Sequence, residues 1–402
     1  MKTEIQLVPP ATQAATTPDN DYISLAPPDI TEMEIAEVVD TLCSGWITTG
    51  PKTKRFEDQF AAYVGSEAAL AVSSCTAALH LALVALGIGP GDEVITTPMT
   101  FASTVHVIVQ VGATPILVDV DPQTLNLDPQ WVADAITPRT KAILPVHYGG
   151  HPVDMAAIMQ LAHEHGLAVI EDAAHALPAA FDGRIIGSAP NLTAFSFYAT
   201  KTLTTAEGGM LTGSAELVEK ARAFSLHGMS RDAWKRYGQH GAWYYEVVCC
   251  GYKYNMTDIQ AALGLVQLSR LDAMYDARRR AVALYDEAFT SWEELVRPVE
   301  LPGVQHAWHL YVLRLNQERL RINRDQFIQE LTARHIGTSV HFIPVHLHPY
   351  YRATYGWQPE DFPVALREYQ RMISLPLHSS HPEANYRRVI AAVQDVVKLY
   401  RK

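Results

Sequence analysis

Short apolar runs alternate with amphipathic stretches over the first two thirds of the chain. The apolar runs predict buried strands at 69–72, 93–96, 114–118, 140–145, 167–171, 192–197 and 209–212. Apolar residues at helical spacing predict helices between them, at 76–86, 103–111, 152–164 and 215–223. Strands that alternate with helices form mostly parallel sheets covered by helices. The pattern therefore predicts an α/β fold in which helices cover both faces of one large sheet.

The pattern changes near residue 256, where a helical stretch begins that continues to about residue 289. After this stretch, strands expected at 309–315 and 337–342 mix with helices expected at 324–334 and 383–399. A change of pattern along one long helix is a natural boundary between lobes. We expect a flexible N-terminal arm at 1–25, a large domain at 26–265 and a smaller α+β domain at 266–402.

Composition narrows the class of protein. The chain has 402 residues, of which 48% are hydrophobic, so it is long enough to bury the core of a two-lobed enzyme. It carries 32 basic and 43 acidic residues, a net charge of −11, and no basic cluster stands out, so we expect neither nucleic acid nor an anionic membrane as a partner.

Three further features indicate where the protein works. No apolar run is long enough to cross a bilayer. The first 21 residues are rich in Thr, Ala and Pro and lack the apolar core of a signal peptide. The four cysteines show no disulfide spacing, which favours reduced thiols in a cytoplasm.

A carboxylate follows one of the predicted strands. Asp172 directly follows the apolar run at 167–171 and precedes small residues. We therefore place it at the carboxyl edge of the sheet, where ligands of open α/β sheets bind. There it can bind a metal, a ribose or a protonated pyridine nitrogen, and a helix N-cap is an equally good interpretation.

A lysine follows the next strand. Lys201 lies in the polar turn between the predicted strands at 192–197 and 209–212, which is 29 positions after Asp172 and about one strand-loop-strand unit away. Pyridoxal phosphate needs such a pair, because a lysine forms an imine with it and a carboxylate keeps its ring nitrogen protonated. Ser196, five positions before Lys201, can donate its hydroxyl to the cofactor phosphate.

Two more turns follow strands of the same sheet. The segment 72–79 passes from a strand into small polar residues that open a helix, and free N–H groups at a helix start can bind a phosphate, although an N-cap is an equal alternative. Phe101, after the strand at 93–96, can cover one face of a pyridine ring, but a lone aromatic residue is more often part of a core.

Together these segments resemble the DegT/DnrJ/EryC1/StrS nucleotide-sugar aminotransferases, which are fold type I pyridoxal phosphate enzymes, and most of all the group that makes UDP-4-amino-4-deoxy-L-arabinose. The resemblance covers the chain from about Leu42 and rests on 44–52 (SGWITTGPK), 143–148 (ILPVHY), 171–176 (EDAAHA), 206–209 (AEGG) and 251–258 (GYKYNMTD). It implies that Lys201 forms the imine and that Asp172 holds the ring nitrogen. It further implies that His175 lies beside the phenolic oxygen, that Ser196, Cys75 and Thr76 hold the phosphate, and that Phe101 stacks on the ring.

The resemblance also implies the partners of the enzyme. Asn255 would reach the phosphate of the other subunit's cofactor, which requires a homodimer with shared active sites, while Thr49 and His346 would contact the substrate. The substrates would be a nucleotide-linked keto sugar, in particular a 4-keto sugar, and L-glutamate, which yields 2-oxoglutarate. We expect no metal site, because His341, His346 and His348 lack acidic or cysteine partners nearby.

Two alternatives share this scaffold. A sugar dehydratase of the same family carries histidine in place of the lysine, so Lys201 argues against it. A non-catalytic ligand-binding or regulatory protein would carry a DNA-binding module, and the sequence contains no basic extension of that kind.

Overall fold

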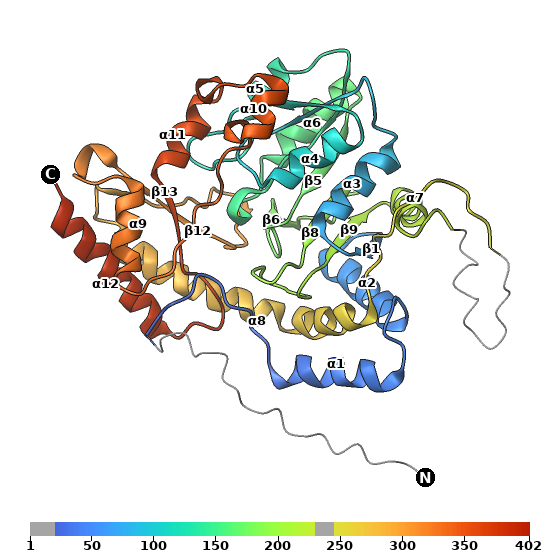
Figure 1. The fold of residues 1–402 in the computed structure, drawn as a ribbon, viewed down its shortest axis with the longest axis horizontal. Helices are drawn as coiled ribbons and strands as arrows, with labels where there is room; N and C mark the ends of the chain where they lie inside the picture. The colour runs from blue at the N-terminus through green and yellow to red at the C-terminus, as the bar shows by residue number, and fades with distance from the viewer. Residues whose placement is uncertain (1–20, 230–244) are drawn as a thin grey trace, which may run out of the picture.

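The computed structural model describes residues 21–229 and 245–402. In Figure 1 the large lobe lies on the right and the small lobe on the left. The large lobe is built on a seven-stranded sheet in the order β1-β9-β8-β5-β4-β2-β3. Its strands are β1 (Ala68–Val72), β2 (Glu93–Thr96), β3 (Thr114–Leu117), β4 (Thr140–Ile143), β5 (Ala168–Asp172), β8 (Leu192–Ser196) and β9 (Gly209–Gly213). All seven predicted strands are confirmed to within two residues at each end.

The sheet is mostly parallel, as predicted. Within it, β9 runs against both of its neighbours, β1 and β8, while β8, β5, β4, β2 and β3 are parallel. The parallel strands end at one edge of the sheet, so Asp172 at the end of β5 and Ser196 at the end of β8 lie side by side there.

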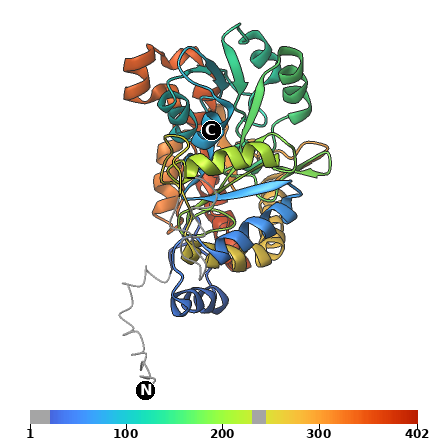
Figure 2. The ribbon, with the colours of Figure 1, turned by 90° about the vertical axis from the view of Figure 1, so that its right-hand side faces the viewer.

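Helices cover both faces of this sheet. Alternate residues of each strand point to opposite sides, and apolar side chains on both sides are buried beneath these helices. The helices of the large lobe are α1 (Glu32–Ser44), α2 (Pro51–Val64), α3 (Cys75–Leu86), α4 (Ala102–Gln110), α5 (Pro129–Asp134), α6 (Met155–His165), α7 (Ala215–Ser225) and the start of α8 (Asp258–Phe289). Val169 of β5 packs in the core under α2, α6 and α8, whereas the next residue, Ile170, packs under α3, α4 and α7. Figure 2 looks at the β1 edge of the sheet and shows α7 beside β1.

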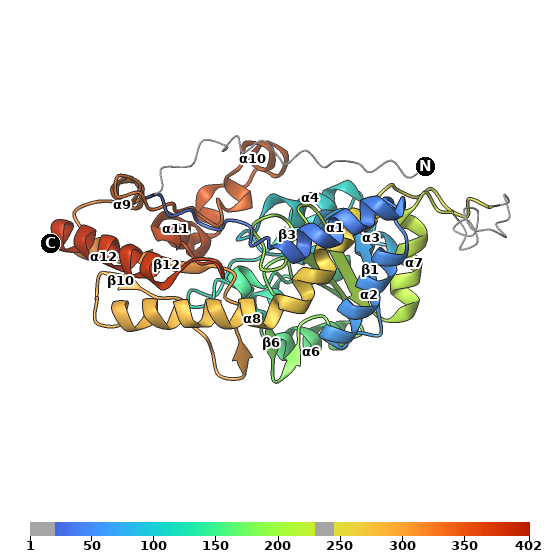
Figure 3. The ribbon, with the colours of Figure 1, turned by 90° about the horizontal axis from the view of Figure 1, so that it is seen from below.

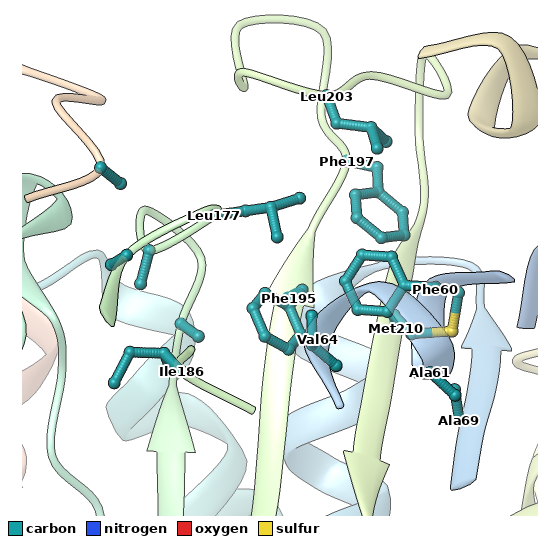
Figure 4. Packing of buried hydrophobic residues seen from close by; sticks show 14 of the residues in the cluster. Phe60, Ala61, Val64, Ala69, Leu177, Ile186, Phe195, Phe197, Leu203 and Met210 are labelled. Carbon is teal, nitrogen blue, oxygen red and sulfur yellow. The ribbon is translucent and has the colours of Figure 1, made fainter. Parts of the chain in front are cut away.

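Aromatic side chains fill the first of these two cores (Figure 4). Phe60 of α2 contacts Phe195 and Phe197, with ring centroids 5.1 and 5.5 Å apart. All three side chains are 0% exposed. Phe197 directly follows β8, so this packing fixes the strand that leads to Lys201 four residues later.

The small lobe is an α+β unit, also as predicted. Its three-stranded sheet has the order β10-β12-β13, and a second small sheet, β11-β6-β7, lies apart from it. The elements of the small lobe are β10 (Leu295–Val296), β11 (Val304–Gln305), β12 (Tyr311–Leu315), β13 (Met372–Leu375), α9 (Arg324–Thr332), α10 (Pro349–Tyr355), α11 (Pro363–Arg371) and α12 (Glu383–Tyr400). The second sheet joins β11 to two strands of the large lobe, β6 (Ala180–Phe181) and β7 (Arg184–Ile185).

One predicted strand is wrong. Residues 337–342 form only a single bridge, Ser339 with Ser374, and β13 takes the place beside β12. The segment leaves the small lobe instead, because Val345 N–H donates to the carbonyl of Pro98 in the large lobe at 2.8 Å.

Helix α8 links the two lobes, as Figures 1 and 3 show. Its side chains as far as Met274 belong to the core of the large lobe, and those from Tyr275 onward belong to the core of the small lobe. We therefore propose to divide the lobes within α8. Residues 1–20 of the expected N-terminal arm lie outside the described residues. Near its end, Ile23 is 2% exposed and pairs with Ile336 of the small lobe.

Among the described residues, no helix has the length and apolar character needed to span a membrane.

Candidate active site

The carboxyl ends of β5 and β8 open into a cavity of about 510 Å³ between the two lobes. It contains seven of the residues expected at the cofactor: Cys75, Thr76, Phe101, Asp172, His175, Ser196 and Lys201. Three residues from the C-terminal part of the chain complete the wall: His309, His341 and Phe342. The fold therefore brings together side chains that lie more than 200 positions apart in the sequence.

Asp172 is buried beneath this cavity and is only partly neutralised. The hydroxyl of Thr104 donates to its Oδ2 at 2.8 Å, and the N–H of Ala174 donates to its Oδ1 at 3.1 Å. Burial raises the pKa of Asp172 above its ordinary value, against the lowering effects of these two hydrogen bonds and of the charge of Lys201. A carboxylate in this condition is stabilised by any cation that binds next to it. The alternative of a helix N-cap is wrong, since no helix begins at this residue.

Lys201 lies in the turn that follows β8. Its N–H donates to the carbonyl of Tyr198 at 2.9 Å, which closes the turn and holds the side chain at the cavity. Burial lowers the pKa of Lys201 to about 8, although the thiol of Cys75 and the carboxylate of Asp172 act to raise it. About a tenth of this amine is therefore neutral, and so nucleophilic, at pH 7.

The start of α3 forms another part of the wall. Ser74 is its N-cap and accepts a hydrogen bond from Ala77 N–H at 3.1 Å. Because the first N–H groups of a helix have no intrahelical acceptor, those of Cys75 and Thr76 are free for an anion. The N-cap interpretation of this segment is confirmed at Ser74, and the phosphate site stays a prediction that is compatible with this cap, because the next two N–H groups are left available.

The approach of α3 to the sheet requires a glycine. A Cβ atom on Gly209 of β9 would lie 2.5 Å from the carbonyl carbon of Ser74 and 2.6 Å from the nitrogen of Cys75. The thiol of Cys75 lies 3.6 Å from the carbonyl of Ala194, and burial raises its pKa well above the ordinary value, so it stays neutral. The backbone N–H of Cys75, at the start of the helix, is therefore better suited to a phosphate than its side chain.

Ring side chains line the opposite side of the cavity. Phe101 is 63% exposed, so the alternative of a core aromatic residue is wrong. Its ring centroid lies 6.0 Å from that of Phe342, which in turn lies 5.6 Å from that of His175. His175 is buried, and its Nδ1 has no hydrogen-bond partner among the described residues. Burial, together with Lys201 and His341, lowers the pKa of His175 well below its ordinary value, so the ring is neutral.

Asn255 and Thr49 lie elsewhere in the same chain. Both line a separate cavity of about 420 Å³, where Asn255 Nδ2 donates to the hydroxyl of Thr49 at 2.6 Å. Asn255 does not cap α8, because Thr257 is the N-cap and forms a capping box with Gln260. Within one chain, neither residue reaches the cavity of Lys201.

His346 is also outside this cavity. It is 0% exposed, its Nε2 lies 3.2 Å from the carbonyl of Pro359, and its ring contacts Phe362. Among the histidines of this segment, His341 lines the cavity of Lys201, so a contact of His346 with the substrate stays a prediction. Sequence analysis missed His309, whose only signal in the sequence is its position at the start of a predicted strand.

These residues fit pyridoxal phosphate. A buried lysine and a buried carboxylate line one cavity, and two N–H groups at a helix start have no intrahelical acceptor. Nδ1 of His175 has no hydrogen-bond partner in the described part of the chain. In the part of the chain that the structure describes, no group of three or more His, Cys, Asp or Glu side chains is arranged to hold a metal ion.

Comparison with known proteins agrees with this cofactor. The model of the DegT/DnrJ/EryC1/StrS aminotransferase family matches residues 28–394. The chain belongs to this family. It is 52% identical over 381 residues to the spore coat polysaccharide biosynthesis protein SpsC of Bacillus subtilis, covering 94% of this chain and 98% of SpsC. It is also 53% identical over 371 residues to the uncharacterized protein MJ1066 of Methanocaldococcus jannaschii, covering 92% and 96% of the two chains.

Solved structures of the family give the same result. The putative sugar aminotransferase Spr1654 of Streptococcus pneumoniae superposes with a TM-score of 0.88 in both its PLP form and its PMP form. The two forms are 36% and 37% identical to this chain, and each comparison covers 94% of this chain and 99% of Spr1654. The protein is thus a pyridoxal-phosphate-dependent sugar aminotransferase. The expected enzyme class and cofactor are confirmed, in preference to a dehydratase or a non-catalytic protein.

Proposed function

We propose that this aminotransferase moves the amino group of L-glutamate to a nucleotide-linked 4-keto sugar and releases 2-oxoglutarate. The observation that carries the proposal is the pair formed by Lys201 and Asp172 at one cavity, where the lysine amine is partly neutral and burial raises the pKa of the carboxyl group. The sugar nucleotide is supported by the family and by the name of SpsC, since polysaccharides are built from nucleotide-activated sugars. The segments at 206–209 and 251–258 resemble those of enzymes that aminate C4.

The cofactor supplies two things when it is bound: an aldehyde carbon that forms an imine, and a cationic ring that accepts the electron pair of a broken C–H bond. Lys201 would hold the cofactor through its side-chain amine, and an amino donor would take its place there. The amine of Lys201 would then be the base that accepts the α-proton of the donor and the acid that gives this proton up again. The same residue moves the proton in the opposite direction when the keto sugar enters.

The other residues of the cavity would position the cofactor and stabilise its charges. Asp172 would keep the proton on the ring nitrogen, and its buried carboxylate would be stabilised by the positive charge that this proton brings. The hydroxyl of Ser196 and the N–H groups of Cys75 and Thr76 hold the phosphate. Phe101 would cover the pyridine ring. A ring nitrogen of His175, either Nδ1 or Nε2, would bind the phenolic oxygen of the cofactor.

Borohydride reduction tests the role of Lys201. We expect the purified protein to be yellow and the reduced cofactor to be found on Lys201 by peptide mass spectrometry. The Lys201→Ala protein should bind cofactor without a covalent link and complete no turnover. Lys141 lies exposed on β4, so Lys141→Ala is a matched control that should behave as the natural protein. An adduct on another lysine would contradict the assignment.

A panel of substrates tests the sugar. Nucleotide-linked 4-keto and 3-keto sugars, including the UDP-linked 4-keto pentose expected for the arabinose group, should be tested with glutamate as donor. We expect the 4-keto compounds to have the highest kcat/KM, and preference for a 3-keto compound or for a sugar without a nucleotide would overturn the proposal.

The dimer is part of the same proposal. Asn255 does not line its own chain's Lys201 cavity, although the segment that carries it passes beside the start of α3, where Ser73 N–H donates to the carbonyl of Tyr254 at 2.7 Å. We propose that Asn255 completes the phosphate site of the partner subunit and that Thr49 lies at the same shared site. We also propose that the enzyme works in the cytoplasm, in keeping with its four free cysteines.

Mixed dimers test the shared site. In a dimer of a Lys201→Ala chain with an Asn255→Ala chain, both changes fall in one active site if Asn255 acts across the interface, and the other site is intact. Activity should then recover to a level that neither parent reaches. If mixed dimers form without recovery, Asn255 acts within its own chain.

A further inference from the structure

Arg278 is an unusual cation in the middle of the molecule. It lies on α8, just beyond the point where the helix passes from one core to the other, and is 1% exposed. Within the described residues it makes no ion pair, and its Nε and Nη2 have no hydrogen-bond partner. Burial lowers its pKa to about 10, so it is still charged at neutral pH. A buried charge without a carboxylate costs stability, which suggests that it is retained for another reason.

What Arg278 does bind is backbone. Its Nη1 donates to the carbonyl of Leu377 at 2.8 Å and to the carbonyls of Trp308 and His309 at 3.3 Å each. Trp308 has a φ of +50°, a conformation that a large side chain rarely adopts. Arg278 thus holds a turn that would not be stable alone.

The turn that carries Trp308 and His309 also contacts the large lobe. Ala307 N–H donates to the carbonyl of Gly150 at 2.8 Å. Gly150 has a φ of +102°, and a Cβ atom there would lie 3.1 Å from the nitrogen of His309 and 2.9 Å from the carbonyl oxygen of His175. The glycine therefore permits a close approach that brings His309 to His175.

The rings of these two histidines are in contact. Their centroids lie 4.4 Å apart at an interplanar angle of 36°. Because Nδ1 of His175 has no partner among the described residues, its neighbours His309 and Phe342 orient this ring by packing rather than by a hydrogen bond from that atom. Lys201 and His341 are the other titratable groups that act on His175.

We propose that Arg278 and His309 are positioning residues, which act at the reacting centre by fixing the imidazole of His175. Arg278 fixes the turn, the turn fixes the ring of His309, and that ring fixes His175 beside the cofactor. The inference rests on the proposed contact between His175 and the phenolic oxygen. Through Arg278 and His309, α8, which joins the two lobes, is thus connected to the active site.

The absorption spectrum of the bound cofactor tests this connection, because a group at the phenolic oxygen changes the pH at which the visible band titrates. His175→Asn is the reference and should shift that midpoint. His309→Ala should shift it in the same direction and by about half as much or more, because the ring of His175 is no longer fixed. His309→Phe keeps a ring at this position and should leave the midpoint close to that of the natural protein. Thermal melts confirm that each variant is folded.

Arg278→Met removes the donors and keeps an apolar side chain of similar length. We expect it to shift the midpoint as His309→Ala does, and the double variant to shift it no further, because the two residues act in series. Additive shifts would overturn the role of Arg278. If Arg278→Met does not fold, Arg278→Lys is used in its place. Because lysine retains one cationic donor group, we expect its midpoint to lie between those of the natural protein and of His309→Ala.

The outcomes separate this inference from the proposal on which it rests. If His175→Asn shifts the midpoint and His309→Ala does not, or if His309→Phe shifts it as much as His309→Ala does, the positioning role is wrong. If His175→Asn itself has no effect, the contact of His175 with the phenolic oxygen is wrong, and the inference falls with it.

Discussion

Glu171 and Asp172 are neighbours at the end of β5, and both are buried, yet their surroundings are opposite. Glu171 accepts hydrogen bonds from His147 at 2.9 Å, Asn191 at 2.7 Å and Thr193 at 3.0 Å. Burial would raise its pKa, but these partners lower it below the ordinary value, whereas burial prevails at Asp172 and raises its pKa. One carboxylate is fully satisfied by the protein, and the other is left for a ligand.

The difference teaches how a strand end becomes an active site. Successive side chains of a strand point to opposite faces of the sheet, so one residue can be built into the core while the next faces a cavity. Val153 N–H donates to Nδ1 of His147 at 3.1 Å, which leaves Nε2 to carry the proton toward Glu171. The three donors thus close the hydrogen-bond network of Glu171, although this residue also lines a cavity of about 400 Å³, whereas Asp172 is left open toward the cofactor cavity.

The largest expected effect is on activity at the open carboxylate. Asp172→Asn should reduce kcat for both half-reactions by about 10³-fold, a size typical for loss of an essential electrostatic group, because an amide cannot keep the ring nitrogen protonated. Its melting temperature without cofactor should stay the same or rise, since the change removes a destabilised charge. Stopped-flow absorbance with glutamate measures the first half-reaction, and a rate near that of the natural protein would contradict the role.

Glu171→Gln should have the opposite profile. An amide cannot accept all three hydrogen bonds as a carboxylate does, so we expect a loss of about 2 kcal/mol in the free energy of unfolding, within the range for breaking a buried network. The stability that the charge contributes is present above the ordinary carboxyl pKa and is lost as pH falls through the lowered pKa of Glu171, so the difference between the two proteins should shrink in acid. Urea denaturation at several pH values measures it.

Glu164→Gln, at an exposed position on α6, is the control for that change and should alter stability little. If Glu171→Gln is as stable as the control, the closed network does not stabilise the fold.

A smaller effect is expected at Thr104, which holds the open carboxylate. Thr104→Val removes the hydroxyl but keeps the shape, and the pKa of Asp172 should rise further, because this hydrogen bond lowers it. We expect a loss of about tenfold in the rate of the glutamate half-reaction, since a hydrogen bond to a charged group contributes about 1.5 kcal/mol. Thr104→Ser should restore most of it, and equal rates for the valine and serine variants would show that the hydroxyl has no such part.

The smallest expected effect is on pH dependence. With a pKa of about 8 for Lys201, the neutral fraction, and so the rate at which cofactor adds to the cofactor-free enzyme, should be about fourfold higher at pH 9 than at pH 7.5. Because the charge of Asp172 raises this pKa, Asp172→Asn should move the midpoint to lower pH, whereas Glu171→Gln should leave it in place. The visible absorbance after mixing with pyridoxal phosphate measures the rate.

The same lysine makes the stability of the cofactor-free protein depend on pH. Its pKa in the folded chain is lower than its ordinary value, so the folded state binds fewer protons between about pH 8 and the ordinary lysine range. The cofactor-free protein should therefore gain stability from this group as pH rises through that interval.

The local sequence pattern was sufficient to predict the position of an active-site residue that directly follows a strand of the large sheet. Lys201 and Asp172 each follow an apolar run, and parallel strands end at one edge, so their meeting could be predicted from spacing. It was not sufficient for His309, His341 and His346. All three lie near strand-like or proline-rich segments of the small lobe, and the packing of that lobe against the large one decides which of them faces the cavity.

The sequence by itself determined the seven strands of the large sheet, the long helix that joins the lobes and the pair of residues that identifies the cofactor. These features follow from hydrophobic periodicity and from residues next to each strand, which are local properties of a chain. Only the tertiary structure decided that residues 337–342 leave the small sheet, that Asn255 lies away from its own chain's cavity and that Arg278 supports His309. These placements depend on contacts between segments far apart in sequence, where burial and close backbone approach outweigh local preference.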